Sequence, residues 1–404
     1  MDMDMSDDLR RFQTDVRTFL EDALTPEIRE AARLSTTILA EHGITQRWHK
    51  ILHKQGWAAP GWPVEHGGTG WSPVERYLYA TEYARAGAPI LSPLGLAMVG
   101  PAIMGHGSDA QKAFYLPRIL SGEDVWCQGY SEPGAGSDLA SLQCRTVVDG
   151  DGDDDDYIVN GAKTWTTNAH NANRMFCLVR TNSEGKPQTG ITFILLEMDT
   201  PGITVAPIHI LGGDHEFNQV FFDDVRVPCA GRVGAEDDGW TVAKYLLEFE
   251  RGFAAAAAPL RARLTDIRGM AARRRSGGDR LLDEPAFSRS LAALEIELTS
   301  VEYTEHRSMA EMALRGSPGP ASPMLKTRAT DVQMAISELA LEAIAYYAAP
   351  HQPEERLAGA NLPPIGERDE MSITARYLND RAVAIYGGSN EIQRNIMAKL
   401  VLGM

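Results

Sequence analysis

The sequence predicts a multidomain α+β protein in which a β-rich segment separates two helical segments. Three observations predict this order: apolar residues recur at helical spacing before residue 126, short β-rich runs follow, and helical spacing then returns. With 404 residues, the chain exceeds what one hydrophobic core normally holds. We therefore expect an N-terminal α-helical domain at 1–126, a middle β domain at 127–234 and a C-terminal α-helical domain at 235–404.

The first segment carries several helix-start signals. Ser6 precedes the first run of helical spacing and can cap it. Ser72 with Glu75, and Ser108 with Gln111, have the spacing of capping boxes, in which side chain and backbone satisfy each other in the first turn. These signals predict helices that begin directly after the three serines.

The other two segments carry different secondary-structure signals, strands in the middle segment and helices in the last. The predicted strands of the middle segment are Tyr157–Val159, Met175–Arg180, Ile191–Glu197, Ile203–Pro207 and Val220–Val227. Asn160-Gly161 is a hairpin dipeptide, which predicts a tight turn directly after the first strand. The helices expected in the last segment are 240–270, 286–315, 322–349, 369–386 and 390–402.

Composition limits the classes of partner. A formal net charge of −16 argues against nucleic acid or an anionic membrane as the main partner. No apolar run is long enough to span a membrane, and the acidic N-terminus lacks the pattern of a secretory or mitochondrial targeting segment. The four cysteines are widely spaced, which predicts reduced thiols in a cytoplasmic protein. His49 and His53 lie four residues apart without a third ligand, so we expect surface histidines and no metal.

Two segments carry functional chemistry, CQGYSEPGAGSDLASL at 127–142 and NGAKTWTTNA at 160–169. The first places a carboxylate, a Pro-Gly turn and hydroxyls on a tight loop, whose backbone N–H groups can face an anion or a ring nitrogen. The second sets Trp165 between hydroxyls, which suits an aromatic wall beside a flat cofactor. Alone, each segment is also compatible with ordinary turn chemistry, and Trp165 with a core position.

With AIYGGSNEIQRNIMAKL at 384–400 as a third match, these segments resemble the acyl-CoA dehydrogenase family, and the resemblance extends over nearly the whole chain. It implies a β-barrel-like middle domain and a four-helix-bundle C-terminal domain. It also implies FAD as cofactor, an acyl-CoA as substrate and an electron-transferring flavoprotein as electron acceptor.

The resemblance implies roles for individual residues. Ser137 would face the pantetheine of coenzyme A, and Arg251 would be a further substrate contact. Tyr130 and Ser131 are also compatible with plain turn residues. The residues matched to FAD contacts are Gln128, Tyr130, Ser131, Trp165, Thr167, Ser389 and Glu391.

The catalytic base is not where the family usually carries it. The matching position is Gly387, which cannot abstract a proton but keeps a backbone N–H that would polarise the thioester oxygen. Glu250 follows Leu246 and Leu247 at helical spacing, so it falls on an apolar helix face, where burial raises the pKa of a carboxyl group. Some family members carry their base at this place, and we expect Glu250 to take the α-proton. A buried ion pair or a helix-packing glutamate is the alternative.

Two regions that hold a neighbouring subunit's FAD in homotetrameric members differ in this chain. They are RRRSGGDRLLDEPAF and ELALEAIAYYAAPHQPEE, and the second lacks the glycines that let a backbone approach a pyrophosphate. The pattern is similar to the large subunit of pimeloyl-CoA dehydrogenase and to the α chains of heterotetrameric dehydrogenases for steroid side chains. It implies an α2β2 hetero-oligomer with a companion chain, or else a homo-oligomer. The expected substrate carries a bulky or functionalised acyl group, such as a steroid side chain or a dicarboxylyl group.

Two other functions stay open on the same fold. A flavin-dependent oxidase or monooxygenase would react directly with oxygen. A non-catalytic partner subunit of a heteromeric dehydrogenase would need no base, which is compatible with Gly387.

Overall fold

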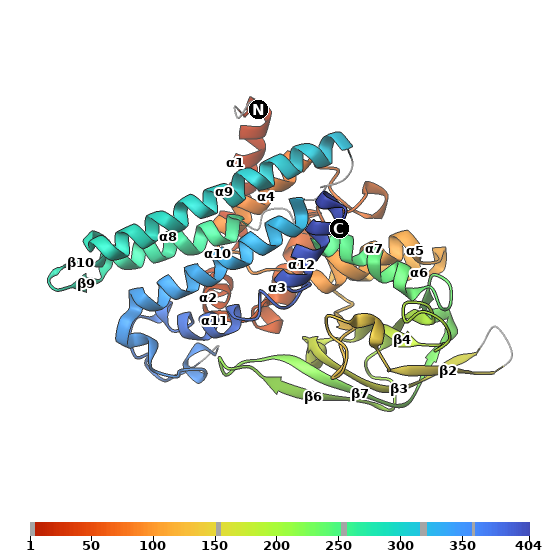
Figure 1. Cartoon of the computed structure of the whole chain (residues 1–404). Coiled ribbons are helices and arrows are strands. Elements are labelled where there is room, and N and C mark those ends of the chain that lie inside the picture. The colour runs from red at the N-terminus through yellow and green to blue at the C-terminus, as the bar shows by residue number, and fades with distance from the viewer. Residues whose placement is uncertain (1–4, 151–154, 252–256, 316–320, 358–359) are drawn as a thin grey trace.

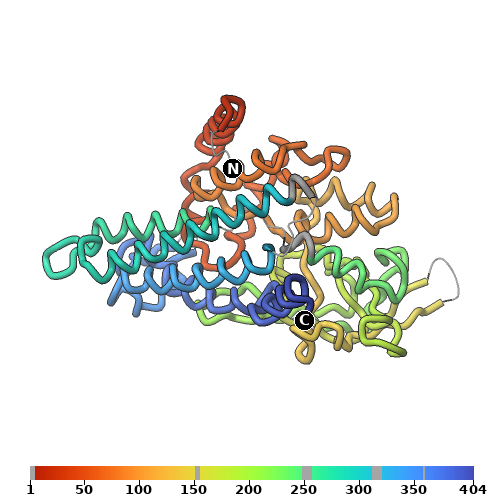
Figure 2. The backbone as a smooth tube through the Cα atoms, turned by 45° about the horizontal axis from the view of Figure 1, so that its top comes forward, coloured from red at the N-terminus to blue at the C-terminus, as the bar shows by residue number. Residues whose placement is uncertain are grey.

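The computed structural model of the chain describes residues 5–150, 155–251, 257–315, 321–357 and 360–404. Its elements follow the predicted order of helices, strands and helices (Figure 1). The strands lie together on one side of the molecule, and helices from both ends of the chain pack beside one another on the other (Figure 2). The α+β architecture expected from the sequence is therefore confirmed.

The first helical part begins its helices at the predicted caps. Ser6 accepts from the N–H three residues on, and both capping boxes form, Ser72 with Glu75 and Ser108 with Gln111. These caps satisfy backbone N–H groups that have no partner inside a helix. The six α-helices described in this part are α1 (Asp7–Ala23), α2 (Pro26–Leu34), α3 (His42–Gln55), α4 (Pro73–Arg85), α5 (Gly100–His106) and α6 (Asp109–Ser121).

The middle part forms a sheet in the order β6-β7-β3-β2-β4-β5-β8, and β1 pairs with β4. The predicted strands lie within β3 to β7, whereas β1, β2 and β8 were not expected. Strand β4 is buried along its whole length, which explains its unbroken apolar run. The strands are β1 (Trp126–Gly129), β2 (Arg145–Asp149), β3 (Asp156–Thr167), β4 (Arg174–Arg180), β5 (Ile191–Glu197), β6 (Ile203–His209), β7 (His215–Pro228) and β8 (Arg232–Val233).

The hairpin expected at Asn160-Gly161 is wrong. Both residues lie inside β3, and the register against β7 shifts between Val159 and Gly161, which marks a β-bulge. Gly161 has a φ of 143°, and an added Cβ would lie 2.9 Å from the Cα of Cys144. Gly161 thus permits the backbone of Cys144, just before β2, to approach β3 closely. The strand continues through the dipeptide, although the dipeptide alone predicts a turn.

The last part is helical, as expected, with some different boundaries. The helix predicted at 240–270 is replaced by α7 and α8, on either side of residues 252–256, which lie outside the described part. Helices α8, α9 and α10 pack side by side around a core that includes Leu264, Phe287 and Ile336 (Figures 1 and 2). The helices are α7 (Gly239–Arg251), α8 (Ala257–Arg273), α9 (Pro285–Arg315), α10 (Ala321–Ile344), α11 (Ile373–Asp380) and α12 (Asn390–Met397).

A second core fixes the sheet to the helices. It contains Ile103 of α5, Trp126 of β1, Phe176 of β4, Phe193 of β5 and Leu246 of α7, each nearly inaccessible to solvent. Because these residues come from the sheet, from a helix before it and from a helix after it, the sheet and both helices share one packed interior.

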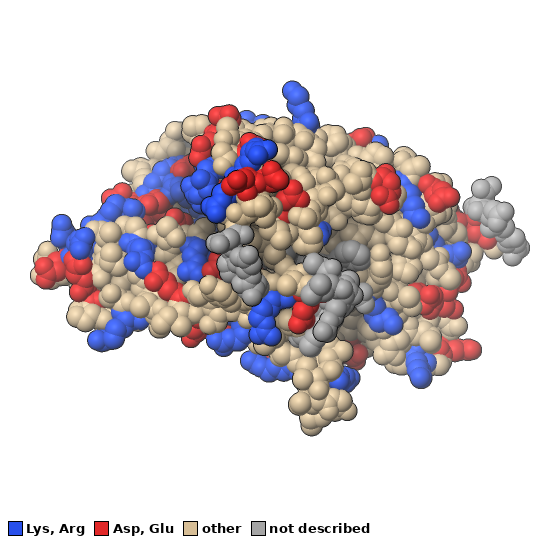
Figure 3. Space-filling model, turned by 90° about the horizontal axis from the view of Figure 1, so that it is seen from above, with Lys and Arg blue, Asp and Glu red and all other residues tan. Residues whose placement is uncertain are grey.

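The surface and the thiols are unremarkable for a chain of this composition. All four cysteines are free thiols, as predicted. Acidic and basic side chains intermix over the helical face in Figure 3. No helix among the described residues is long and apolar enough to cross a membrane.

His49 departs from the expected surface position. It is 6% exposed on α3, and its Nε2 lies 3.0 Å from the carbonyl oxygen of Leu120, which it meets as a donor. Burial lowers the pKa of His49, because the charged imidazolium loses more hydration than the neutral ring. His53, one turn further on, is exposed as expected. In the described part of the chain, no group of three or more His, Cys, Asp or Glu residues is arranged to hold a metal ion.

The buried His49 predicts a pH dependence of stability. Its pKa is lower in the folded chain than in the unfolded chain, where it is about 6.5. The stability that neutral His49 contributes is therefore fully present above about pH 6.5, and it is lost as the pH falls through the pKa of the folded state. Urea unfolding across this pH range should show a smaller loss of unfolding free energy for His49→Gln than for wild type. Glutamine keeps a hydrogen-bond donor but cannot become charged. The control His53→Gln should keep most of the wild-type slope of unfolding free energy against pH. Equal slopes for wild type and His49→Gln would contradict the role of the buried His49.

Candidate active site

A buried ion pair joins the two motif segments. Lys163 points inward from β3 and is fully buried, and its Nζ lies 2.7 Å from Oε1 of Glu132. The same Nζ donates to the carbonyl oxygen of Tyr130 at 3.3 Å. The Glu132 carboxylate also accepts from the backbone N–H groups of Gln143 and Cys144, at 2.6 and 2.9 Å. The loop between β1 and β2 is thereby closed on itself and fixed to β3.

The tip of this loop is an open glycine turn. Glu132 and Ala135 exchange backbone hydrogen bonds of 2.8 and 3.1 Å, so the Pro-Gly pair forms the tip. A Cβ added at Gly134 or Gly136 would meet no described atom within 4 Å, and neither glycine has a left-handed backbone. Packing within the chain therefore does not require these glycines, whereas close approach of a ligand to the backbone would. Ser137, the predicted substrate contact, is exposed beside this turn.

Trp165 is turned outward by a second bulge in β3. The register against β7 shifts between Lys163 and Thr166, and bulges of this kind re-aim side chains. Trp165 has a φ of 55°, which non-glycine residues rarely adopt, and it is 59% exposed. Its ring meets Phe217 edge to face, with centroids 5.8 Å apart. Trp165 is therefore not a core residue, and its free surface suits a flat aromatic ligand.

Ser131 lies beside this bulge. Its carbonyl oxygen accepts from the N–H of Thr164 at 2.8 Å, which brings the loop alongside Trp165. Thr167 ends β3 and Gln128 lies in β1, and both are partly exposed. The structure thus brings Ser131, Trp165 and Thr167 onto one stretch of surface.

Tyr130 takes a different position from the one expected for a ligand-facing ring. It is 6% exposed and meets Phe176 and Phe193 edge to face, at centroid distances of 5.7 and 6.4 Å. Its ring belongs to the core that fixes the sheet to the helices.

The C-terminal motif forms a glycine turn ahead of α12. Gly387 and Gly388 have φ values of 64° and 79°, and the buried Gln393 donates to both carbonyl oxygens at 3.0 and 3.3 Å. Ser389 caps the helix, and the exposed Glu391 has a lowered pKa because its own backbone N–H and Ser389 donate to it. Both residues thus stabilise the helix start, and Gly387 is exposed on the turn.

The predicted base lies at the end of α7. The described part of this helix buries Val242 and Leu246, which is the apolar face on which Glu250 is expected. The side chains of Glu250 and Arg251 lie outside the described part of the chain. Their roles therefore stay predictions.

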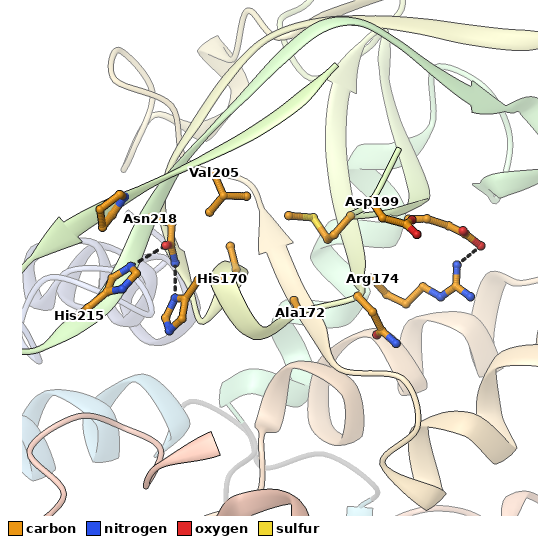
Figure 4. Close-up of a pocket in the computed structure, with 12 residues that line it drawn as sticks. His170, Ala172, Arg174, Asp199, Val205, His215 and Asn218 are labelled. Atoms are coloured by element: carbon orange, nitrogen blue, oxygen red, sulfur yellow. Dashed lines mark hydrogen bonds and ion pairs between the residues drawn. The ribbon is translucent and has the colours of Figure 1, made fainter. Parts of the chain in front are cut away.

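A cavity of about 520 Å³ is lined by residues of β4 to β7 and of the segment that follows β3 (Figure 4). His170, His215 and Asn218 line one side of it, and Arg174 lines another. Asn218 is fully buried, and its Nδ2 donates to the carbonyl oxygen of Thr166 at 3.0 Å. Because that carbonyl can only accept, Oδ1 faces His215 and accepts from its Nε2 at 2.7 Å. The cavity wall thereby supports β3, although none of the predicted FAD contacts lines the cavity.

Sequence reasoning missed the supporting residues of this site. Lys163 shares its inward parity with Tyr157 and Val159, and that parity is the signal that could have placed it in the interior. The hairpin expected at Asn160-Gly161 hid it, because a turn there would break the alternation. Asn218 carried no comparable signal, since a buried polar residue in a strand is recognised only from its partners.

Removal of one member of the ion pair should destabilise the chain. Lys163→Met leaves Glu132 buried without a cation, and the free energy of unfolding should fall by about 3–5 kcal/mol. The double variant Glu132→Gln/Lys163→Met should recover part of this loss, because no buried charge remains. Urea unfolding measures both, and a single variant within about 1 kcal/mol of wild type would show that the pair is not needed.

Comparison with known proteins gives a consistent picture. Family models for acyl-CoA dehydrogenase match at residues 6–123 (N-terminal domain), 127–225 (middle domain) and 237–402 (C-terminal domain). The chain is 36% identical over 408 residues to acyl-CoA dehydrogenase IpdE1 of Mycobacterium tuberculosis, covering 98% of each protein. A chain of the ChsE4-ChsE5 complex from Mycobacterium tuberculosis has a TM-score of 0.83 and 30% identity, covering 100% of this chain and 99% of that one. A chain of the Tcur3481-Tcur3483 steroid ACAD has a TM-score of 0.84 and 28% identity, with the same coverage.

Proposed function

The chain belongs to the acyl-CoA dehydrogenase family, and on that premise we propose that it oxidises an acyl-CoA thioester to the 2,3-enoyl-CoA with FAD as cofactor. The observation that carries this proposal is the joined loop and strand, which present Ser131, the exposed ring of Trp165 and Thr167 on one stretch of surface. The open glycine turn and the outward tryptophan fit a flat ring system with a neighbouring backbone contact.

The residues of the chain divide the chemistry between them. Glu250 takes the α-proton of the thioester, and the N–H of Gly387 stabilises the negative charge that develops on the thioester oxygen. FAD, when bound, would supply the two-electron acceptor for the β-hydrogen. Ser137 contacts the pantetheine and Arg251 the substrate. A glycine at position 387 keeps the polarising N–H and leaves space where a side chain would otherwise stand.

The proposed substrate carries a bulky or functionalised acyl group, such as a steroid side chain or a dicarboxylyl group. Support comes from the full-length likeness to a chain of the Tcur3481-Tcur3483 steroid ACAD. Electrons pass on to an electron-transferring flavoprotein.

The proposed assembly is an α2β2 hetero-oligomer with a companion dehydrogenase-like chain, with a homo-oligomer as the alternative. The likeness to a chain of the ChsE4-ChsE5 complex supports it. The segment ELALEAIAYYAAPHQPEE, the second of the two regions that differ from homotetrameric members, also supports it, because its Tyr346 is 93% exposed. Arg274, in the other differing region, is bound to Glu370 and lies over the ring of Tyr347, so internal contacts already occupy its guanidinium.

A second candidate function is a non-catalytic subunit that completes a partner's site, and the observation that favours it is Gly387. An oxidase is distinguished by oxygen consumption with substrate. The non-catalytic subunit is separated from the dehydrogenase by a variant of the predicted base.

The proposed function predicts anaerobic bleaching of the flavin absorbance by acyl-CoA thioesters. A panel of thioesters should be added to the purified chain, with its companion present if the chain alone is colourless. Glu250→Gln should keep the flavin and lower the rate of bleaching by about 10²–10⁴-fold, because it removes the base and not the cofactor contacts. Glu338→Gln, on an exposed face of α10, is the matched control and should react like wild type.

Bleaching at the wild-type rate by Glu250→Gln would contradict the assigned base and favour the non-catalytic subunit. Bound flavin that no thioester bleaches would contradict dehydrogenation itself.

A further inference from the structure

A buried carboxylate outside the proposed chemistry connects three parts of the chain. Glu216, in β7, is 7% exposed. Its Oε1 accepts from the backbone N–H of Ile38 at 3.0 Å, and its Oε2 accepts from Nδ2 of Asn379 at 3.2 Å. Ile38 belongs to the irregular segment after α2, and Asn379 belongs to α11. One side chain therefore links the sheet to helical parts from both ends of the chain.

The segment that Glu216 holds has little secondary structure of its own. Residues 35–38 lie between α2 and α3, and other parts of the molecule satisfy their polar groups. Nδ2 of Asn379 donates to the carbonyl oxygen of Thr36 at 2.9 Å, and Arg376 donates to that of Ser35 at 2.7 Å. In Figure 1 the end of the β6–β7 hairpin lies beside α11, in agreement with the approach of Gly212 to Ala375.

The backbone around Glu216 reaches the proposed flavin wall directly. Its carbonyl oxygen accepts from the N–H of Asn168 at 2.9 Å, and Asn168 has a left-handed φ of 58°. The next residue, Phe217, is the ring that meets Trp165. On the opposite side, α11 ends at Asp380 and leads into the glycine turn at Gly387. Glu216 thus lies between two of the three segments that carry the predicted FAD contacts.

The hydrogen bonds around Glu216 favour an ionised carboxylate. Two donors approach it, one at each oxygen, and an amide in its place would turn its N–H groups toward one of them. Burial, with Asp214 nearby, raises the pKa of Glu216 and opposes this state. Glu216 forms no ion pair with a described residue, and burial of an unpaired charge costs free energy. Its two hydrogen bonds therefore serve to fix a geometry.

We propose that Glu216 is a positioning residue that holds the Trp165–Asn168 segment of β3 at a fixed distance from α11 and the glycine turn at Gly387. This inference rests on the proposed function, because the gap between those segments is where the flavin would bind. Glu216 acts through its neighbours and is not itself a contact of the reacting atoms.

The test compares three variants of the full chain with a matched control. Glu216→Gln keeps the shape but turns an amide toward one donor, Asn379→Ala removes the partner in α11, and the third variant combines both. Asp224→Asn is the control, because it removes a carboxylate from the same strand, where Asp224 accepts from Asn160 at 2.9 Å. Hydrogen exchange of the chain without FAD and the FAD dissociation constant are measured, with the companion chain in the binding assay if wild type requires it.

The expected result is faster exchange in Glu216→Gln both at residues 164–168 and at 377–388, and about tenfold weaker FAD binding. The effects of the double variant should be clearly smaller than the sum of the two single effects, because both changes break the contact between Glu216 and Asn379. Each change also removes a contact of its own, to Ile38 and to Thr36, so equality with one single variant is not required. The control should match wild type. If Glu216→Gln does not fold, Asn379→Ala gives the same two readouts.

Three results would overturn the inference: faster exchange confined to residues 36–38, unchanged FAD affinity, or additive effects of the two variants. A wild-type chain that binds no FAD, with or without a companion, would instead contradict the proposed function. In that case the exchange data still decide whether Glu216 holds the two segments together.

Discussion

The buried pair of Glu132 and Lys163 is the interaction on which the proposed active site depends. Removing two charges from water costs several kcal/mol per ion, and the attraction between them offsets this only when further hydrogen bonds complete their shells. Here the lysine also meets the carbonyl oxygen of Tyr130, and the glutamate accepts two backbone N–H groups. The pair therefore contributes less to net stability than to selecting a single loop conformation. Only that conformation makes all four contacts: the ion pair itself, the bond to the carbonyl oxygen of Tyr130 and the two bonds from backbone N–H groups. That conformation sets Ser131 beside the bulge that turns Trp165 outward.

Backbone strain occurs where this architecture meets its proposed ligand, as it does at three other described non-glycine residues with positive φ. Two non-glycine residues with a left-handed backbone, Trp165 and Asn168, lie within four positions of each other at the end of β3. Such conformations cost about 1–3 kcal/mol each and persist only when the surroundings hold them. The ion pair holds one end of this stretch, and the carbonyl oxygen of Glu216 holds the other. A rigid wall of this kind reduces the ordering that a bound ring system would otherwise require.

Local signals predicted the helices and the motif segments well, because caps and apolar spacing act within a few residues. Ser72 and Ser108 began helices as expected, and the exposed Trp165 stands apart from the core. The failures involve contacts between distant segments. Asn160-Gly161 favours a hairpin locally, but pairing with β7 extends β3 through it and converts the glycine into a bulge. Likewise, the burial of His49 and the link from Glu216 to Ile38 and Asn379 depend on packing between parts of the chain far apart in sequence, which no local pattern encodes.

The central claim is that the loop and strand joined by Glu132 and Lys163 form one wall of a flavin site. An experimental structure of the chain reconstituted with FAD, together with its companion chain if one is needed, tests it most directly. The account predicts the isoalloxazine ring against Trp165, with Ser131 and Thr167 in contact and the turn at Gly387 facing it. FAD bound elsewhere, for example in the cavity beside His170 and His215, would contradict it.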